Sequence, residues 1–444
     1  MKILIALTVY LSLFTVCSFA KPNIVFILVD DMGYGDLACY GASDAKTPNI
    51  DRLAAEGVRF TQVYANGAEC TPSRTAILTG RYPQRIGGME CAIGTGNVGR
   101  YDDAIALAKK SDLGLPAADA ALAPGLKAAG YQTAAFGKWH LGYEPKFNPL
   151  DQGFDEFRGF LGGNVDYFLH TEHSDLKVMV KGREFEKREG YMTHLITKDA
   201  LEFLGRQTKD NPFFLYLPYS TPHFPFQGPT DPAPKELWEW ERFLSGTRAE
   251  YVEMLEDMDT NVGQILSALQ KSGLSENTLV VFASDHGAMK PGFNTPFRDY
   301  KGTLFEGGIR VPLIAKWPGK IKPKTKSTQV GCLMDLTTSF LRVAGAKIPE
   351  SLDGIDLLAR VEKDLPNISR ELFWRAKRGD RTWSAARLGN LKFVRKVENG
   401  QTEEWAFDLV KDPGEKSPLP SSGSTRRLQS ALAEWEAEVK APRP

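Results

Sequence analysis

The chain has 444 residues, of which 42% are hydrophobic and 25% are charged, and its 55 basic residues balance its 55 acidic ones. This balance excludes a bulk electrostatic field that would favour nucleic acid or a membrane surface, so an anionic ligand would have to be attracted by a local basic pocket. The length is enough for two domains around one large core.

The first twenty residues are predicted to be a secretory signal peptide. Lys2 provides the positive start, residues 3–16 form an apolar run too short to span a bilayer comfortably, and residues 18–20 have the small-x-small form of a cleavage site. A lipid anchor on Cys17 is the alternative, and the bulky residue before it disfavours that reading. No later segment is long and apolar enough to cross a membrane. We therefore expect an exported protein, periplasmic or secreted.

Residues 21–345 are predicted to form the larger domain, with alternating strands and helices. Residues 24–29 are apolar throughout, as expected of a parallel strand covered on both faces. Further strands are expected at 131–136, 213–217, 278–284 and 311–317, and helices at 47–57, 192–207 and 248–269. This alternation predicts an α/β fold with a mostly parallel sheet sandwiched by helices, in which ligands bind at the carboxyl ends of the strands.

Residues 346–444 have a different pattern. Short strand-like runs follow one another in hairpin spacing, and the chain closes with a helical segment. The expected strands are 371–376, 382–388, 391–397 and 405–409, and the expected helix is 426–439. We predict a smaller C-terminal antiparallel α+β domain that packs on the first.

One cysteine stands where a short helix is predicted to begin. In the stretch 69–80, Pro72 suits a first helical turn and Gly80 ends the helix. A side chain at a helix start faces unpaired backbone N–H groups and the positive end of the helix dipole, so Cys70 is well placed to handle an anionic group. Arg74 adds a cation one turn later. Taken alone, a cysteine of an exported chain is more often buried or disulfide-bonded.

Carboxylates follow two of the predicted strands. Asp30 and Asp31 come directly after the first strand, and Asp285 and His286 come directly after the strand at 278–284. Adjacent like charges are costly unless a cation or hydrogen bonds neutralise them, although an Asp pair is also common in turns. Since the carboxyl ends of parallel strands meet at one edge of a sheet, three carboxylates and an imidazole are expected to converge. Such oxygen-rich sets suit Ca²⁺ or Mg²⁺ better than a soft metal.

Other polar side chains lie next to further predicted strands. Lys138 and His140 alternate after one of them, so in an extended segment they would point to one side. His223 lies between prolines after another, and Lys301 stands in a glycine-rich stretch before a third. A lysine and a histidine aimed together can bind an anion and move a proton. Each segment alone, however, reads as an ordinary polar loop.

The order of these motifs resembles that of the type I sulfatases, the formylglycine-dependent branch of the alkaline phosphatase superfamily. The match extends over residues 23–312, and the Cys-x-Pro-x-Arg run at 70–74 is its most specific part; residues 407–415 also resemble the family's C-terminal motif. The resemblance implies an alkaline-phosphatase-like fold, hydrolysis of sulfate esters and a divalent cation. It also implies a maturation enzyme that oxidises Cys70 to formylglycine, whose hydrated aldehyde is the nucleophile.

The resemblance assigns the metal site to residue 70 and the polar groups at the strand ends. These implied ligands are Asp30, Asp31, Cys70, Asp285 and His286. The family's metal is usually calcium, and we expect it ahead of magnesium. His286 stands where the family often has Asn, and an imidazole suits calcium less well than an amide oxygen does.

The remaining implied roles concern the sulfate group. Arg74 would hold the hydrated aldehyde, while Lys138 and Lys301 would grip the sulfate oxygens. His223 would protonate the leaving alcohol, and His140 would take the proton of the second hydroxyl so that the aldehyde returns.

Two alternatives are left open. A phosphatase or phosphodiesterase of the same superfamily typically uses a Ser or Thr nucleophile and two transition metals, whereas the six histidines here show no paired metal-ligand spacing. A non-catalytic binder of sulfated glycans would have lost at least one catalytic position, and none is missing. Among substrates, we expect a sulfated carbohydrate ahead of an aryl or steroid sulfate.

Two segments with little motif character are expected to border the pocket mouth and to choose the substrate. One is residues 87–116, which includes Arg100, and the other is residues 167–173, whose aromatic and polar side chains suit a sugar ring. Arg100 and His173 are therefore expected substrate-binding residues, although both segments can equally be solvated loops.

Overall fold

The structure is a computed structural model that describes residues 21–94, 101–173 and 176–439. The predicted signal peptide at residues 1–20 and the side chain of Arg100 lie outside the described residues. Within the described ranges, the helices are all too short or too polar to cross a membrane. The cysteines in these ranges form no disulfides with one another; they are Cys39, Cys70, Cys91 and Cys332.

The larger of two sheets contains the strands of the first three-quarters of the chain. They are β1 (Asn23–Val29), β2 (Val58–Tyr64), β3 (Gln132–Lys138), β4 (Glu156–Phe160), β5 (Met179–Lys181), β6 (Glu184–Phe185), β7 (Phe213–Pro218), β8 (Thr278–Ser284), β9 (Arg310–Lys316), β10 (Thr325–Ser327) and β11 (Gly331–Cys332). Their order in space is β10-β2-β9-β8-β1-β7-β3-β4-β5-β6, and β11 also pairs with β2. The central strands β8, β1, β7, β3 and β4 run parallel to one another, whereas β9 runs antiparallel to both β8 and β2, and β5 runs antiparallel to β4. The predicted mostly parallel sheet is confirmed.

Helices cover both faces of this sheet, and β1 shows why. Phe26 and Leu28 point into one core cluster, whereas Ile27 and Val29 point into a second cluster on the opposite face, and all four are fully buried. The helices of the first cluster are α2 (Cys70–Thr79), α4 (Leu122–Ala128), α9 (Asp335–Val343) and α10 (Leu357–Glu362). Those of the second are α1 (Pro48–Ala55), α5 (Met192–Leu204) and α7 (Arg248–Lys271).

Shorter helices lie in the connections. The α-helical ones are α3 (Asp102–Ala108), α6 (Trp240–Leu244) and α8 (Glu306–Ile309). Single 3-10 turns occur at Tyr34–Asp36, Ala38–Tyr40, Pro83–Arg85, Ala117–Asp119, Pro145–Phe147, Pro149–Gln152 and Ser275–Asn277. The connections that follow β1, β3, β7 and β8 begin at the same edge of the sheet, at the carboxyl ends of these strands, and the functional residues gather there.

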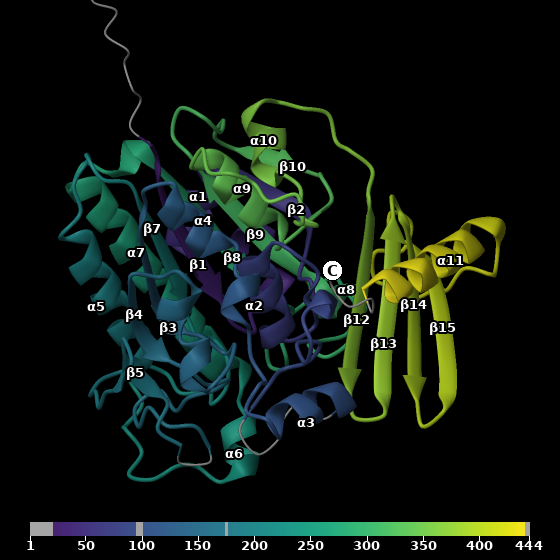
Figure 1. The fold of residues 1–444 in the computed structure, drawn as a ribbon, viewed down its shortest axis with the longest axis horizontal. Coiled ribbons are helices and arrows are strands. Elements are labelled where there is room, and N and C mark those ends of the chain that lie inside the picture. The colour runs from purple at the N-terminus through teal and green to yellow at the C-terminus, as the bar shows by residue number, and fades with distance from the viewer. Residues whose placement is uncertain (1–20, 95–100, 174–175, 440–444) are drawn as a thin grey trace, which may run out of the picture.

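The predicted C-terminal antiparallel sheet is also confirmed. It consists of β12 (Glu371–Arg378), β13 (Arg381–Leu388), β14 (Leu391–Glu398) and β15 (Gln401–Asp408), with α11 (Gly423–Glu438) packed against β13 and β14. Figure 1 shows this unit in yellow-green beside the main body. Strand β15 begins four residues earlier than expected, because its first residues are exposed and polar and carry no alternation. A domain boundary after residue 345 stays a prediction.

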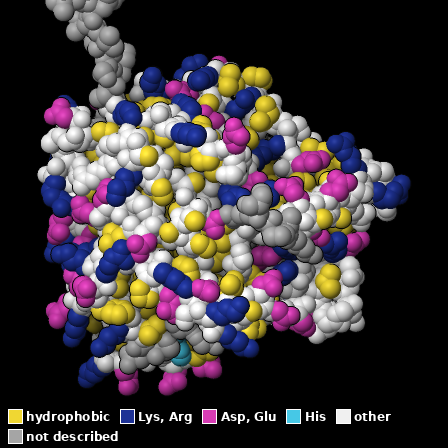
Figure 2. Space-filling view, viewed as in Figure 1, with side chains coloured by type: hydrophobic (Ala, Val, Ile, Leu, Met, Phe, Trp, Pro, Cys, Tyr) yellow, Lys and Arg dark blue, Asp and Glu magenta, His cyan; other side chains and the backbone are white. Residues whose placement is uncertain are grey.

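The two sheets share buried contacts. Trp374 of β12 donates from its indole nitrogen to the carbonyl oxygen of Ala65 at 2.7 Å, and Phe305, just before α8, packs edge-on against Trp383 of β13. The C-terminal sheet therefore rests on the segments that lead into and out of the functional region. The visible surface carries acidic and basic side chains interspersed over the whole face (Figure 2), in keeping with the zero net charge.

Candidate active site

The acidic residues predicted at the strand ends lie together. Strands β1 and β8 are parallel neighbours with Val29 opposite Ser284, so the residues that follow them meet at one edge. The potential ligand atoms of Asp30, Cys70, Asp285 and His286 all lie within 4.8 Å of one another, and those of Asp30, Asp31 and His223 form a second such group. All of these side chains are buried. The structure thus joins two strand ends, the start of α2 and the segment after β7.

Cys70 is the first residue of α2 and is only 1% exposed. Its Sγ lies 3.3 Å from Nζ of Lys138, 3.8 Å from Nζ of Lys301 and 3.2 Å from Nε2 of His286. Burial alone would raise the pKa of this thiol, but the three nitrogen groups outweigh it and hold the pKa well below its usual value. The surroundings of residue 70 therefore favour a negative charge.

Two lysines pair with the adjacent carboxylates. Nζ of Lys138 contacts Oδ2 of Asp30, and Nζ of Lys301 lies 2.6 Å from Oδ1 of Asp31. Burial would lower the pKa of Lys301, yet Asp31 and Cys70 outweigh it and raise that pKa. Lys301 therefore stays charged, and the two lysines flank Cys70, where they can accept an anion between them.

Arg74 contacts a carboxylate and a backbone carbonyl of the site. Its Nε and one terminal nitrogen donate to Oδ2 of Asp285 at 3.2 and 3.0 Å, and the other terminal nitrogen donates to the carbonyl oxygen of Lys138 at 2.9 Å. The side chain is completely buried. This arrangement fixes a carboxylate and the end of β3, and the expected contact of Arg74 with the hydrated aldehyde stays a prediction.

The backbone at His140 is not extended, although the sequence predicted that it would be. Lys138 ends β3, and His140 does not continue an extended segment but adopts a left-handed backbone conformation with φ of 58°. Its Nε2 lies 2.6 Å from the carbonyl oxygen of Ile93, while its Nδ1 is buried without a hydrogen bond. Nε2 must carry the proton in that contact, so Nδ1 keeps its lone pair. Burial and Lys138 lower the pKa of His140, against the opposing effect of Cys70, so the ring is neutral and able to accept a proton.

His223 lies beside Asp31. Its Nδ1 lies 2.7 Å from the carbonyl oxygen of Phe224, and its Nε2 lies 3.5 Å from Oδ2 of Asp31. The first contact fixes the proton on Nδ1 when the ring is neutral, so Nε2 is the atom that can gain and release a proton towards the site.

The acidic cluster fits a divalent cation. Oδ2 of Asp31 and Oδ1 of Asp285 are buried oxygens that accept no hydrogen bond. Burial and the nearby Asp30 raise the pKa of Asp285 to about 7, so its charge is poorly compensated by protein groups alone. Carboxylate oxygens that accept no hydrogen bond from the protein are donors that Ca²⁺ and Mg²⁺ prefer. His286 adds an imidazole, and its pKa is raised to about 10 because Asp285 and Cys70 outweigh the effect of burial.

Comparison with known proteins decides the family. Residues 22–346 match the family profile described as Sulfatase, and residues 297–441 match the one described as N-sulphoglucosamine sulphohydrolase, C-terminal. The chain belongs to the sulfatase family. This sulfatase is an enzyme that hydrolyses sulfate esters, and the family implies both a metal ion and a formylglycine.

Relatives match along almost the whole of this sulfatase. It is 36% identical to mouse (Mus musculus) N-acetylgalactosamine-6-sulfatase, over 93% of this chain and 84% of that protein. It is 32% identical to human (Homo sapiens) arylsulfatase A, over 94% of this chain and 87% of that protein. The crystal structure of Ps i-CgsB in complex with k-i-k-neocarrahexaose superimposes with a TM-score of 0.81 at 30% identity, over 95% of this chain and 94% of the other. The alkaline-phosphatase-like architecture is thereby confirmed.

Segments 87–116 and 167–173, which are expected to determine substrate specificity, have different surroundings in the structure. His173 packs against the rings of Trp240 and Phe243 at centroid distances of 4.6 and 5.1 Å. In the segment 87–116, Glu90 is buried in an ion pair with Arg375 and so faces the C-terminal sheet. Arg100 is outside the described residues, so its expected role stays a prediction.

Sequence reasoning missed several groups that shape the site. The carbonyl oxygen of Ile93 is a backbone atom and leaves no signature in the sequence. Tyr251 of α7 donates to the carbonyl oxygen of Asp31 at 3.0 Å and to Oδ2 of Asp36 at 2.6 Å, which holds the turn after β1. A tyrosine on an amphipathic helix gives no sign of such a contact.

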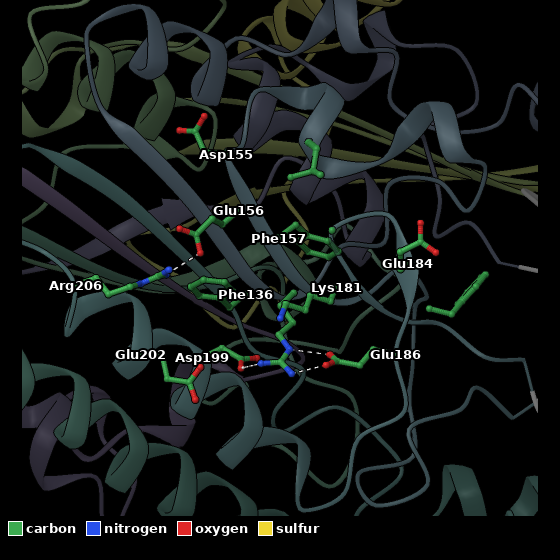
Figure 3. Close-up of a pocket in the computed structure, with 14 residues that line it drawn as sticks. Phe136, Asp155, Glu156, Phe157, Lys181, Glu184, Glu186, Asp199, Glu202 and Arg206 are labelled. Carbon is green, nitrogen blue, oxygen red and sulfur yellow. Dashed lines mark hydrogen bonds and ion pairs between the residues drawn. The ribbon is translucent and has the colours of Figure 1, made fainter.

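A cavity of about 870 Å³ lies away from this cluster, between the strands β3 to β6 and the helix α5. Figure 3 shows its lining, in which Arg206 pairs with Glu156 at 2.8 Å. Its lining residues do not include any member of the cluster around Cys70. Its size therefore does not make it the active site of this sulfatase.

Proposed function

We propose that this sulfatase removes sulfate from a sulfated carbohydrate, using a formylglycine made from Cys70 and a calcium ion. The observation that carries the proposal is the position of Sγ of Cys70, at the start of α2 and within 4 Å of nitrogen atoms of Lys138, Lys301 and His286. The substrate class is supported by the names of relatives, one an N-acetylgalactosamine-6-sulfatase and one crystallised with k-i-k-neocarrahexaose.

The metal would be held by the carboxylates at the ends of β1 and β8, together with His286 and residue 70. Three carboxylates and only one imidazole favour calcium, with magnesium second. When bound, such a cation neutralises the carboxylates and withdraws charge from the oxygen atoms placed against it. Arg74 would keep Asp285 in place through its two hydrogen bonds, since it already occupies one oxygen of that carboxylate.

The lysines would bind the sulfate group. Formylglycine at residue 70 would replace the thiol group of Cys70 and would supply a hydroxyl nucleophile on a carbon that can return to the aldehyde. Nζ of Lys138 and Nζ of Lys301 flank that point and would donate to the sulfate oxygens, where charge-assisted hydrogen bonds strengthen as negative charge builds up.

Two histidines would move the protons. Nε2 of His223 faces the site beside Asp31 and would give a proton to the leaving alcohol oxygen. Nδ1 of His140 holds a lone pair because Nε2 is engaged by Ile93, so Nδ1 would take the proton of the second hydroxyl. The two rings have different partners, Ile93 for His140 and Phe224 with Asp31 for His223, so the acid and the base would be separate groups.

Export and maturation complete the proposal. Residues 1–20 would direct the chain to the periplasm or the exterior as a signal peptide, and a formylglycine-generating enzyme would act on Cys70. A catalytic domain at 21–345 and a C-terminal subdomain at 346–444 would make up the mature enzyme.

A desulfation screen tests this function. The protein from a host that matures sulfatases is incubated with N-acetylgalactosamine 6-sulfate, chondroitin and carrageenan oligosaccharides, 4-nitrophenyl sulfate and 4-nitrophenyl phosphate. We expect release of sulfate from at least one carbohydrate and no comparable release of phosphate. Mass spectrometry of the tryptic peptide 60–74 should show formylglycine at residue 70. Turnover of the aryl sulfate without any carbohydrate would overturn the proposed substrate class, and an unmodified, active Cys70 would overturn the nucleophile.

A further inference from the structure

The active-site cluster opens to solvent on one side. Its acidic, imidazole and guanidinium side chains are at most 5% exposed, whereas the side chain of Lys301 is 17% exposed. The ring of Phe224 lies beside this opening, because its centroid is 5.9 Å from Nζ of Lys301 and 4.0 Å from the ring of His223. When a sulfate group sits between the two lysines, the rest of the bound substrate therefore extends out of the site past Phe224.

Four aromatic rings continue from that point to the surface. Phe224 contacts Phe243 at 5.9 Å between centroids, and Phe243 stacks on Trp240 at 5.9 Å with an interplanar angle of 14°. His173 packs its ring against both Trp240 and Phe243. We call Phe224, Phe243, Trp240 and His173 the aromatic platform. Its members come from the segment after β7, from α6 and from the loop after β4, so three separate parts of the chain build it.

One member of the aromatic platform is buried and another is exposed to solvent. Phe243 is fully buried, whereas Trp240 is 44% exposed although one of its faces stacks on Phe243. Trp240 therefore stays partly open to solvent while its ring packs against Phe243 and His173. These two contacts hold the indole, so little rotamer freedom remains for a ligand to remove.

We infer that the aromatic platform is a subsite for the sugar ring next to the sulfated one, an inference that rests on the proposed carbohydrate function. A pyranose has an apolar C–H face and a hydroxyl edge, and a rigid aromatic face beside a few polar groups is the surface that such a ring fits. The platform is continuous with the opening at Lys301, which places this ring after the sulfated residue. A single exposed indole is too small for a protein interface, which buries about 800 Å² per partner.

The test compares substrates that differ by the added ring. Steady-state kinetics are measured on the sulfated oligosaccharide that the wild type desulfates fastest, on its sulfated monosaccharide and on 4-nitrophenyl sulfate. For Trp240→Ala we expect the ratio of kcat/KM for the oligosaccharide to that for the monosaccharide to fall about fivefold to tenfold, mainly through KM. Trp240→Leu, which still covers Phe243 but lacks a flat ring, should show the same fall, and Trp240→Tyr should retain most of the ratio.

A matched control uses an exposed aromatic residue elsewhere. Phe185 of β6 is 70% exposed and lies at the far cavity, so Phe185→Ala should leave the ratio as in the wild type. An unchanged ratio in folded Trp240→Leu would overturn the subsite while the carbohydrate function stands. A wild type that turns over 4-nitrophenyl sulfate and no sulfated carbohydrate would instead overturn the proposed substrate class, and the subsite with it.

Discussion

Glu90 and Arg375 form a buried ion pair between the segment after α2 and strand β12. Nε and one terminal nitrogen of Arg375 lie 2.6 and 2.7 Å from the two carboxylate oxygens of Glu90, and the side chains are 4% and 7% exposed. Three residues further along, the amide of Ile93 donates to Oγ1 of Thr71 at 3.1 Å while its carbonyl oxygen meets His140. The C-terminal sheet therefore holds the segment that sets the tautomer of a catalytic candidate.

The first prediction follows from that pair. Arg375→Met leaves a buried carboxylate whose remaining basic partner among the described residues is Lys377 at 3.8 Å, and we expect the free energy of unfolding to fall by about 3–5 kcal/mol. The value of kcat should also fall, because Ile93 loses its fixed place against His140. The double variant Glu90→Leu/Arg375→Met should regain most of the stability, since no uncompensated charge remains. Denaturant unfolding and kinetics measure both effects, and a loss below about 1 kcal/mol for the single variant would contradict the role of the pair.

The second prediction concerns the nucleophile. Cys70→Ala should reduce sulfate-ester turnover to the background rate while the protein stays folded, because the residue is surrounded by polar site groups. Cys70→Ser should be equally inactive unless the host matures serine-type sulfatases. Cys39→Ala, at another free cysteine, is the control and should keep full activity. Wild-type turnover by Cys70→Ala would refute the proposed mechanism.

The third prediction concerns the cation. Asp31→Asn or Asp285→Asn should abolish metal binding and lower turnover by about a thousandfold or more, since the remaining carboxylates cannot balance the ion. His286→Asn should be tolerated better than His286→Ala, because an amide oxygen can replace the imidazole as a ligand. Elemental analysis measures the metal content. Stoichiometric zinc without calcium or magnesium would rule out the proposed site.

The fourth prediction is a pH dependence of stability away from the active site. Nζ of Lys392 lies 2.9 Å from carboxylate oxygens of both Glu306 and Glu415. Burial and Glu306 raise the pKa of Glu415 from 4.5 to about 7, against the effect of Lys392. Between these values the unfolded chain has released its proton while the folded protein keeps it, so rising pH favours unfolding. Glu415→Gln should remove this loss, and its stability relative to the wild type should rise with pH.

Urea unfolding between about pH 5 and about pH 8 measures that difference. Glu350→Gln, at an exposed site, is the control and should change stability little at any pH. The pKa of Glu306 is shifted the other way, to about 2, because Lys392 and Arg310 outweigh burial. Its stabilising effect is present above about pH 4.5 and is lost only as the pH falls towards about 2, so it leaves the window of Glu415 undisturbed. A flat difference between Glu415→Gln and the wild type would contradict the prediction.

The sequence by itself determined the local elements and the order of the motifs. Strand β8 has the predicted bounds Thr278–Ser284. The run of apolar residues predicts a buried strand, and the Asp-His-Gly sequence that follows it predicts where the strand ends. Helix α2 begins at Cys70 as predicted, because Pro72 in its first turn and Gly80 at its end are local signals. Such features depend on side chains within one turn or one strand, and the placement of polar residues after parallel strands then follows from the fold class.

Only the tertiary structure decided the contacts between distant segments. Glu90 and Arg375 are separated by 285 positions, and the aromatic platform joins three segments whose rings give no sign of one another in the sequence. The direction of β9, antiparallel between β2 and β8, is likewise absent from its own residues, because an apolar strand reads alike in both orientations. The left-handed turn at His140 is imposed by its neighbours, which fix the ring through Ile93. Packing between elements selects these arrangements, and the chain's local preferences do not encode them.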